Sequence, residues 1–160
     1  MNKTKFFFFF VQGAGTGITG IFCLKSKIPR KYILTDCHPK VLYNLETNLR
    51  HNLTSDTSSY SLTTLDWESE TPETDNFADV DVVLGADIVF DSRIIPDLVK
   101  TIQTLLSRNF NSLAFIASTI RNEKTYAHFL KELYDQGLNC VDCDYETSDP
   151  IKIIKIQLIG

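Results

Sequence analysis

The sequence predicts an α/β protein with a doubly wound, mainly parallel sheet that ends in a C-terminal antiparallel hairpin. Two observations predict this class. Short apolar segments alternate with helical patterns in five successive units along the 160 residues. After the last helical pattern, two strand-like segments follow one another with only a polar turn between them, at residues 146–150. A chain of this length fits one domain, and we expect residues 1–160 to form it.

The first two units are the most regular. A strand is expected over Phe6–Val11, followed by a glycine turn and a helix over Thr16–Lys25. The next strand covers Lys31–Thr35 and ends at Asp36. A helix then runs over residues 39–51, and the proline that opens it is tolerated because a first-turn N–H has no helical partner.

The remaining units follow the same alternation. The expected elements are a weak strand over 59–65, an acidic polar loop over 68–79, a strand over 80–86, a helix over 94–106, a strand over 112–117, a helix over 122–136 that Gly137 ends, and hairpin strands over 138–145 and 151–159. Parallel strands that alternate with helices place their carboxyl ends at one edge of the sheet. We therefore expect a binding site there, near the point where the strand order reverses.

Composition excludes several classes of function. The net charge of −4 argues against a broad nucleic-acid surface, and the apolar runs are too short to span a membrane. Cys140 and Cys143 have the spacing of a zinc ligand pair but lack a second pair, so reduced thiols are favoured and no metal is expected. Reduced thiols fit the cytoplasm.

The most informative motif is the glycine loop Gly13-Ala14-Gly15-Thr16-Gly17, between the first strand and the first helix. Glycines allow tight turning and close backbone approach, and N–H groups at the start of a helix bind anions. The loop continues to Gly20 and so also satisfies G-x-G-x-x-G. By itself, therefore, it does not exclude a dinucleotide.

Acidic residues follow the next two strands. Asp36 stands near the spacing from the glycine loop at which a carboxylate binds ribose hydroxyls, although it could instead be a charge at the start of the helix. Asp66-Trp67 follows the third strand. Trp67 could cover an adenine ring and Asp66 could accept from its amine, or Trp67 could anchor the loop on the core.

The fourth strand ends in Gly85-Ala86-Asp87-Ile88-Val89-Phe90. Small residues at the strand end leave room for a ligand. We expect Asp87 and Phe90 to face the reacting end of a cofactor, although Asp87 could be an ordinary loop residue. No histidine is spaced as a partner for a serine or cysteine nucleophile, so nothing indicates a hydrolase.

Taken together, the glycine loop, Thr35-Asp36, Leu65-Asp66-Trp67 and the fourth strand end resemble the class I S-adenosylmethionine-dependent methyltransferases, and more narrowly the family 16 protein-lysine methyltransferases. The resemblance implies a Rossmann-like fold with S-adenosylmethionine as cofactor. It also implies cofactor contacts from a set of residues along the strand ends: Gly13, Ala14, Gly15, Gly17, Asp36, Asp66, Trp67 and Ala86.

By the same resemblance, Asp87 and Phe90 match an Asp-x-x-aromatic motif that lines a lysine channel, and elongation factor 2 is the implied protein substrate. The amine must be neutral to attack, which costs about 4–5 kcal/mol at pH 7 from a pKa near 10.4. We expect Asp87 to orient the amine, because a lone carboxylate opposes its deprotonation. The family has an acid where Gln12 stands, and often tyrosine where Phe90 stands.

The chain also begins closer to its first strand than the family does. We expect an N-terminally truncated, monomeric form in which residues 1–12, with five consecutive phenylalanines, derive from translated intron sequence. Two alternatives to an active methyltransferase stay open. One is an inactive isoform that acts as an interaction module, and the other is a NAD-dependent oxidoreductase.

Overall fold

The computed structural model describes residues 8–26, 31–54, 59–69, 77, 80–143 and 150–159. Its elements, in chain order, are β1 (Phe8–Gln12), α1 (Ile18–Ser26), β2 (Lys31–Asp36), α2 (Pro39–Asn52), β3 (Ser59–Thr64), β4 (Val82–Ala86), α3 (Ile95–Ser107), β5 (Leu113–Thr119), α4 (Glu123–Asp135), β6 (Leu138–Asp142) and β7 (Ile151–Leu158). The predicted elements are present, with ends that shift by up to two or three residues. Most of the acidic loop expected over 68–79 lies outside the described residues.

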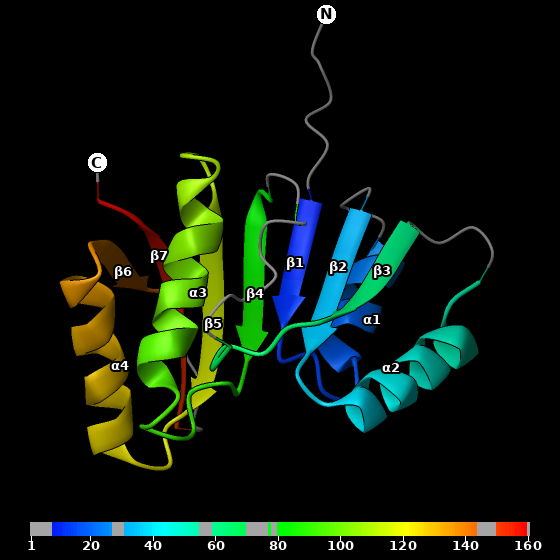
Figure 1. Cartoon of the computed structure of the whole chain (residues 1–160), viewed down its shortest axis with the longest axis horizontal. Helices are drawn as coiled ribbons and strands as arrows, with labels where there is room; N and C mark the ends of the chain where they lie inside the picture. Colours follow the sequence, from blue (N-terminus) through cyan, green and yellow to red (C-terminus); the bar gives the residue numbers. More distant parts are fainter. Residues whose placement is uncertain are drawn as a thin grey trace, which may run out of the picture.

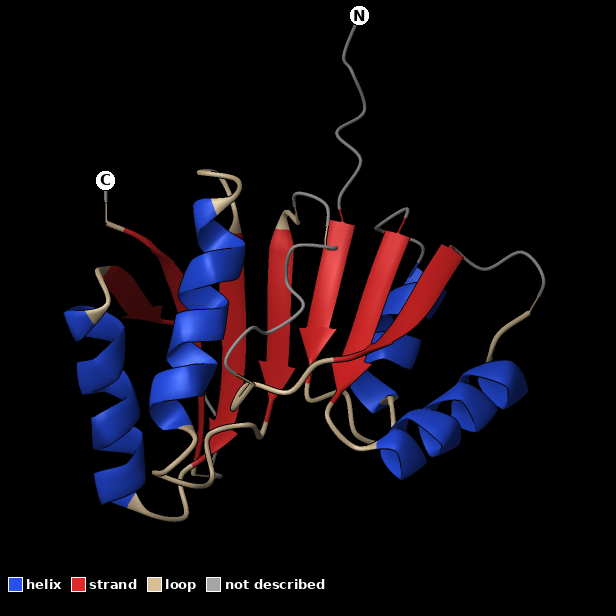
Figure 2. Cartoon of the chain, in the orientation of Figure 1, coloured by secondary structure: helices blue, strands red, loops and turns tan. Residues whose placement is uncertain are grey.

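The strands form one sheet in the order β3-β2-β1-β4-β5-β7-β6 (Figures 1 and 2). The pairs among β1 to β5 are parallel, and β7 pairs antiparallel with both β5 and β6. The predicted fold class is therefore confirmed. The second strand of the hairpin, β7, lies beside β5, and the first strand, β6, lies at the edge of the sheet.

Helices cover both faces of the sheet, and each face has its own core. On one face, Val11, Leu34 and Leu45 belong to a cluster between the strands and the helices α1 and α2. On the other, Phe10 and Ile116 belong to a larger cluster with side chains of α3 and α4. The central strands are buried on both faces, which explains why they appear in the sequence as continuous apolar runs.

Three residues of the phenylalanine run, Phe8 to Phe10, lie in the central strand β1. Phe10 is fully buried and packs edge-to-face on Phe77, with ring centroids 4.8 Å apart, while Phe9 contacts Tyr32 on the opposite face. The strand is fixed at its start by Asp81, whose carboxylate accepts a hydrogen bond from the Phe8 N–H at 2.9 Å. Phe6 and Phe7 lie outside the described residues.

The strand order reverses between β1 and β4. From β1 the chain moves outward through β2 and β3, then returns to pair β4 with the other side of β1. In such sheets the loops at the carboxyl ends diverge at the reversal and leave a crevice for a ligand. Within the described ranges, no helix is long and apolar enough to cross a membrane.

Candidate functional site

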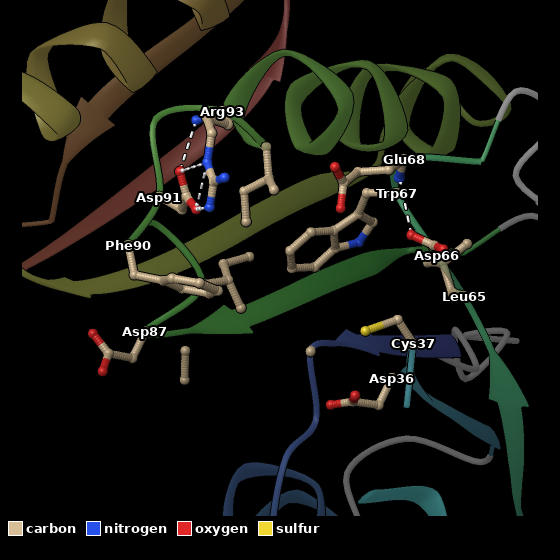
Figure 3. A pocket seen from close by; sticks show the side chains of 14 residues that line it. Asp36, Cys37, Leu65, Asp66, Trp67, Glu68, Asp87, Phe90, Asp91 and Arg93 are labelled. Atoms are coloured by element: carbon tan, nitrogen blue, oxygen red, sulfur yellow. Dashed lines mark hydrogen bonds and ion pairs between the residues drawn. The ribbon is translucent and has the colours of Figure 1, made fainter. Parts of the chain in front are cut away.

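A cavity of about 500 Å³ lies at the carboxyl ends of β1, β2, β3 and β4, where the strand order reverses. Its described lining residues come from four loops: Gly13, Asp36, Cys37, Leu65, Asp66, Trp67, Glu68, Ala86, Asp87, Ile88, Phe90, Asp91, Arg93 and Ile94. Figure 3 shows these side chains. Seven of the ten predicted site residues are in this set. They converge as expected for residues that follow the carboxyl ends of parallel strands.

Gly13, the first residue of the glycine loop, lines the cavity. A Cβ at Gly13 would lie 2.7 Å from the Ile88 methyl and 3.5 Å from the Trp67 ring, so only glycine allows these side chains to approach. The loop is tied to β2 by a hydrogen bond from the Ala14 N–H to the Thr35 carbonyl at 2.8 Å. Gly15 has φ +54, and a Cβ there would meet nothing within 4 Å.

Gly17 occupies a different environment from Gly13. It is buried at the start of α1, and a Cβ there would collide with Leu45 of α2. Ala14, Gly15 and Gly17 are not among the described lining residues of the cavity, whereas Gly13 is.

Asp36 ends β2 and faces the glycine loop. One carboxylate oxygen accepts a hydrogen bond from the Gly15 N–H at 3.1 Å, and the other accepts from the His38 N–H at 3.2 Å. Each oxygen keeps a further lone pair for a ligand hydroxyl. The helix α2 is capped by another residue: the His38 side chain accepts from the Lys40 N–H, and Asp36 accepts from the His38 N–H ahead of the helix.

Trp67 packs on the core, as one of the two alternatives expected, and its place in the cavity leaves the adenine contact as a prediction. Its ring packs against the larger core cluster and also forms a wall of the cavity (Figure 3). Its indole N–H is buried and has no hydrogen-bond partner among the described residues. Asp66 is exposed at the cavity rim, where its carboxylate accepts from the Glu68 N–H at 3.1 Å.

Asp87 and Phe90 lie away from Asp36 and Asp66 in Figure 3, at the other end of the cavity. Asp87 has φ +58, the only positive φ at a non-glycine position among the described residues. Its carboxylate receives two hydrogen bonds from Arg121, at 3.0 and 2.7 Å, and these hydrogen bonds lower the pKa of Asp87. The Phe90 ring is 62% exposed beside it.

Carboxylates dominate the charge of the cavity. Its described lining includes five acidic residues, whereas Arg93 is the one described base. Hydrogen bonds from Arg93 hold Asp91 ionised and lower its pKa to about 2. The acidic excess suits a cationic ligand and opposes a polyanionic one.

Several lining residues are absent from the sequence prediction: Cys37, Leu65, Glu68, Ile88, Asp91, Arg93 and Ile94. Most of these residues lie next to a predicted residue on the same loop. Their position beside a predicted motif is the sequence signal that indicates them. Cys37 is exposed overall, but partial desolvation of its thiol and the nearby charges of Asp36 and Asp66 raise the pKa of that thiol. All four cysteines are free, and no metal-binding group of three ligands occurs in the described part of the chain.

Comparison with known proteins places this cavity in a family. The sequence profile of the lysine methyltransferase family matches residues 10–136, most of the chain. The chain therefore belongs to the lysine methyltransferase family, as its motifs predicted. S-adenosylmethionine is accordingly the cofactor, and membership of this family sets aside the alternative of a nicotinamide-dependent oxidoreductase.

Relatives within the family are protein-lysine N-methyltransferases. The chain is 31% identical over 138 residues to protein-lysine N-methyltransferase EEF2KMT of Homo sapiens, covering 79% of this chain and 42% of that protein. It is 30% identical over 155 residues to protein-lysine N-methyltransferase EFM3 of Saccharomyces cerevisiae, covering 89% of this chain and 43% of that protein. The chain thus spans less than half the length of both proteins.

Solved structures share the fold. Precorrin-6y C5,15-methyltransferase from Geobacter metallireducens has a TM-score of 0.71 at 14% identity, over 96% of this chain and 81% of that one. Magnesium protoporphyrin IX methyltransferase from Synechocystis, solved with bound S-adenosylmethionine, has a TM-score of 0.64 at 12% identity, over 98% and 72%. At these identities the likeness concerns the fold alone.

The residues of the cavity fit S-adenosylmethionine. The volume of about 500 Å³ lies within the range of small-molecule sites. The acidic lining suits a sulfonium cation. Gln12, next to the glycine loop, is fully buried, and neither its side-chain oxygen nor its nitrogen has a partner among the described residues. A buried polar group without a hydrogen-bond partner destabilises the folded protein. The Gln12 side chain is therefore suited to hydrogen-bond a ligand.

Two glycines that both have a positive φ provide a test of whether the glycine loop binds the cofactor. Gly15 and Gly137 have φ values of +54 and +73, and at neither would a Cβ meet an atom within 4 Å. Substituting either with alanine is expected to cost about 1 kcal/mol of unfolding free energy, from left-handed strain alone. Only Gly15→Ala is expected to weaken S-adenosylmethionine binding measured by calorimetry. Equal binding by the two variants would contradict a cofactor role for this loop.

Trp67 provides an intrinsic reporter, because it is the only tryptophan of the chain and lines the cavity. Titration with S-adenosylmethionine is expected to change its fluorescence saturably, at the concentration that calorimetry gives for binding. Trp67→Phe should remove the signal and, because a smaller ring packs less surface, weaken binding by about 3- to 30-fold. Binding without any fluorescence change in the unmodified chain would place the ligand elsewhere.

Proposed function

We propose that this chain is an S-adenosylmethionine-dependent protein-lysine N-methyltransferase whose substrate is elongation factor 2. One observation carries the proposal: an acidic cavity at the switch point of a methyltransferase sheet has Asp87 and the exposed Phe90 at one end. A cofactor fills the cavity while that exposed end stays accessible to a side chain of another protein.

We assign the following cofactor roles, which the geometry of the cavity supports. Asp36 accepts hydrogen bonds from the two ribose hydroxyls with its remaining lone pairs, while it also holds the Gly15 N–H. Trp67 covers the adenine ring, and Asp66 at the rim accepts from its amine. Gly13, Ala14 and Gly15 surround the methionine part of the cofactor. The side-chain oxygen and nitrogen of Gln12, which have no partner among the described residues, form hydrogen bonds with the cofactor there. Ala86 leaves the end of β4 open, whereas Gly17 lets α1 pack closely on α2.

The substrate lysine enters beside Phe90. The aliphatic part of the lysine side chain packs on the Phe90 ring. Asp87 accepts a hydrogen bond from the amine and so orients the lone pair of the amine nitrogen. When bound, S-adenosylmethionine supplies the methyl group on a sulfonium sulfur. Transfer of that methyl group to the amine nitrogen would break the S–C bond, leave its electron pair on the thioether product and release the proton of the nitrogen to water, while Asp87 and Phe90 would hold the amine in place. Alignment of the two reactants supplies most of the catalysis.

Sequence similarity supports the identity of the substrate and its compartment. The chain resembles EEF2KMT and EFM3 over most of its length, and its motifs resemble those of the elongation factor 2 enzyme. Four free cysteines fit a reducing cytoplasm, where elongation factor 2 works. The proposal includes a monomer, with the protein substrate as its partner and without a nucleic-acid or membrane surface.

Methyl transfer tests the proposal. The purified chain is incubated with S-adenosylmethionine and elongation factor 2, and intact mass and peptide mapping follow the product. We expect a gain of one or more methyl groups on a single lysine, and none when S-adenosylhomocysteine replaces the cofactor. Cofactor binding without transfer to elongation factor 2 or to lysates of the source cells would instead favour an inactive interaction module.

A further inference from the structure

The Asp87 carboxylate already has a cationic partner of its own. Arg121 follows β5 and donates from Nη1 to Oδ1 at 3.0 Å and from Nη2 to Oδ2 at 2.7 Å. The Thr119 N–H adds a third hydrogen bond to Oδ1 at 3.4 Å. Two parallel N–H···O bonds from a planar guanidinium fix the plane of a carboxylate as well as its position.

This pairing leaves one acceptor position open. A carboxylate has about four lone-pair sites, two on each oxygen. Oδ1 uses two, for Arg121 and Thr119, and Oδ2 uses one, for Arg121. The remaining site on Oδ2 can accept one N–H from an incoming lysine amine. Arg121 therefore orients Asp87 without displacing the substrate from it.

The pairing also changes the charge that a lysine meets. An unpaired carboxylate within about 4 Å favours the ammonium form and raises the lysine pKa, which removes the nucleophilic lone pair. A carboxylate that is paired with a guanidinium presents almost no net charge, and a guanidinium stays protonated at all relevant pH values. The Asp87 carboxylate can then orient the lysine amine without raising the lysine pKa and keeping the amine protonated.

We propose that Arg121 is a positioning residue for methyl transfer: by pairing with Asp87 it fixes the carboxylate and offsets its charge, so that the bound lysine loses its proton at lower pH. The inference rests on the proposed function. It answers a difficulty in that function, since a lone Asp87 would hold the lysine in its unreactive form.

Other titratable groups near the pair do not replace this effect. Arg93 is committed to Asp91 through hydrogen bonds at 2.5–3.1 Å. Tyr126 of α4 lines a small cavity with Arg121 and Phe90, and burial raises its pKa to about 12, so it stays neutral. The remaining titratable groups in the described lining of the main cavity are Asp36, Cys37, Asp66 and Glu68. Among the described residues, Arg121 is the one cation that pairs with Asp87.

The pH dependence of kcat/KM separates charge from shape. The unmodified chain, Arg121→Gln and Arg121→Lys are compared with elongation factor 2 as substrate at saturating S-adenosylmethionine. Arg121→Gln should move the rising limb of the profile about one pH unit upward, so its rate falls about 10-fold at pH 7 and recovers at high pH. Arg121→Lys keeps the charge and should keep the position of that limb. Affinity for S-adenosylmethionine should stay within about 3-fold in both, since neither Arg121 nor its substitutes line the cofactor cavity.

A titration without turnover accompanies the profile. Carbonyl-labelled Asp87, followed by nuclear magnetic resonance, should have a pKa below its ordinary value in the unmodified chain and a higher one in Arg121→Gln. A rate loss that is equal at every pH, or an Asp87 pKa that does not change, would overturn the inference while leaving methyl transfer established. If the unmodified chain transfers no methyl group, the proposed function fails and this inference fails with it.

Discussion

Asp87→Asn is expected to lower kcat/KM for methyl transfer by about 100-fold or more, because misplacing a reactant by about 1 Å costs this much. Asparagine tolerates the left-handed φ of +58 and keeps the shape of the side chain, so the backbone should be unchanged. What it loses is one carboxylate oxygen and the fixed pairing with Arg121. Methylation of elongation factor 2, measured at saturating cofactor, gives the ratio.

The matched control is Asp91→Asn. Asp91 also lines the cavity, and its two carboxylate oxygens also accept hydrogen bonds from an arginine, from Nε and Nη2 of Arg93. We assign it no contact with the amine and expect its rate to change by less than about 3-fold, as for a surface ion pair of small energetic effect. Equal losses in the two variants would mean that cavity charge, rather than the position of Asp87, governs the reaction. S-adenosylmethionine affinity should be nearly unchanged in both.

Asp36→Ala is expected to weaken S-adenosylmethionine binding by about 100-fold or more. A hydrogen bond to a charged group contributes about 1.5–3 kcal/mol, and in the proposed function Asp36 accepts two from the ribose. The variant also frees the Gly15 N–H, which the carboxylate holds at 3.1 Å, and so loosens the glycine loop. Calorimetry should show the lost affinity in the dissociation constant, while turnover at saturating cofactor should fall much less.

Glu68→Gln is the control for Asp36→Ala. It removes one negative charge from the same cavity, at a rim position with no assigned ligand contact. We expect it to change the affinity by less than about 3-fold, because an exposed charge is well screened. If Glu68→Gln weakened binding as much as Asp36→Ala, the acidic field of the cavity, and not ribose recognition, would explain the affinity.

The sequence predicted the fold and most of the cavity because both depend on local patterns. Apolar runs mark buried parallel strands, and polar residues directly after them converge at one edge of the sheet. Asp36, Trp67 and Asp87 were found in this way, and they line one cavity. Trp67 also shows what the sequence leaves undecided: core packing and a place in the cavity lining were considered as alternatives, but one indole ring can pack on the core and border the cavity together.

Long-range pairings were beyond the sequence. Arg121 is 34 residues from Asp87, and nothing in either segment indicates that β5 places the guanidinium on that carboxylate. Gly17 looked like a ligand-facing glycine, but its lack of a side chain serves the contact between α1 and α2, which only the packing of Leu45 reveals. The entry of β7 beside β5 likewise depends on strand pairing, which a hairpin pattern leaves undecided.

A crystal structure of the chain with bound S-adenosylhomocysteine tests the central claim most directly. We expect the ribose hydroxyls within hydrogen-bond distance of the Asp36 carboxylate, the adenine against Trp67, and the sulfur directed toward Asp87 and Phe90. A ligand bound outside this cavity, or with its sulfur directed away from Asp87, would contradict the account.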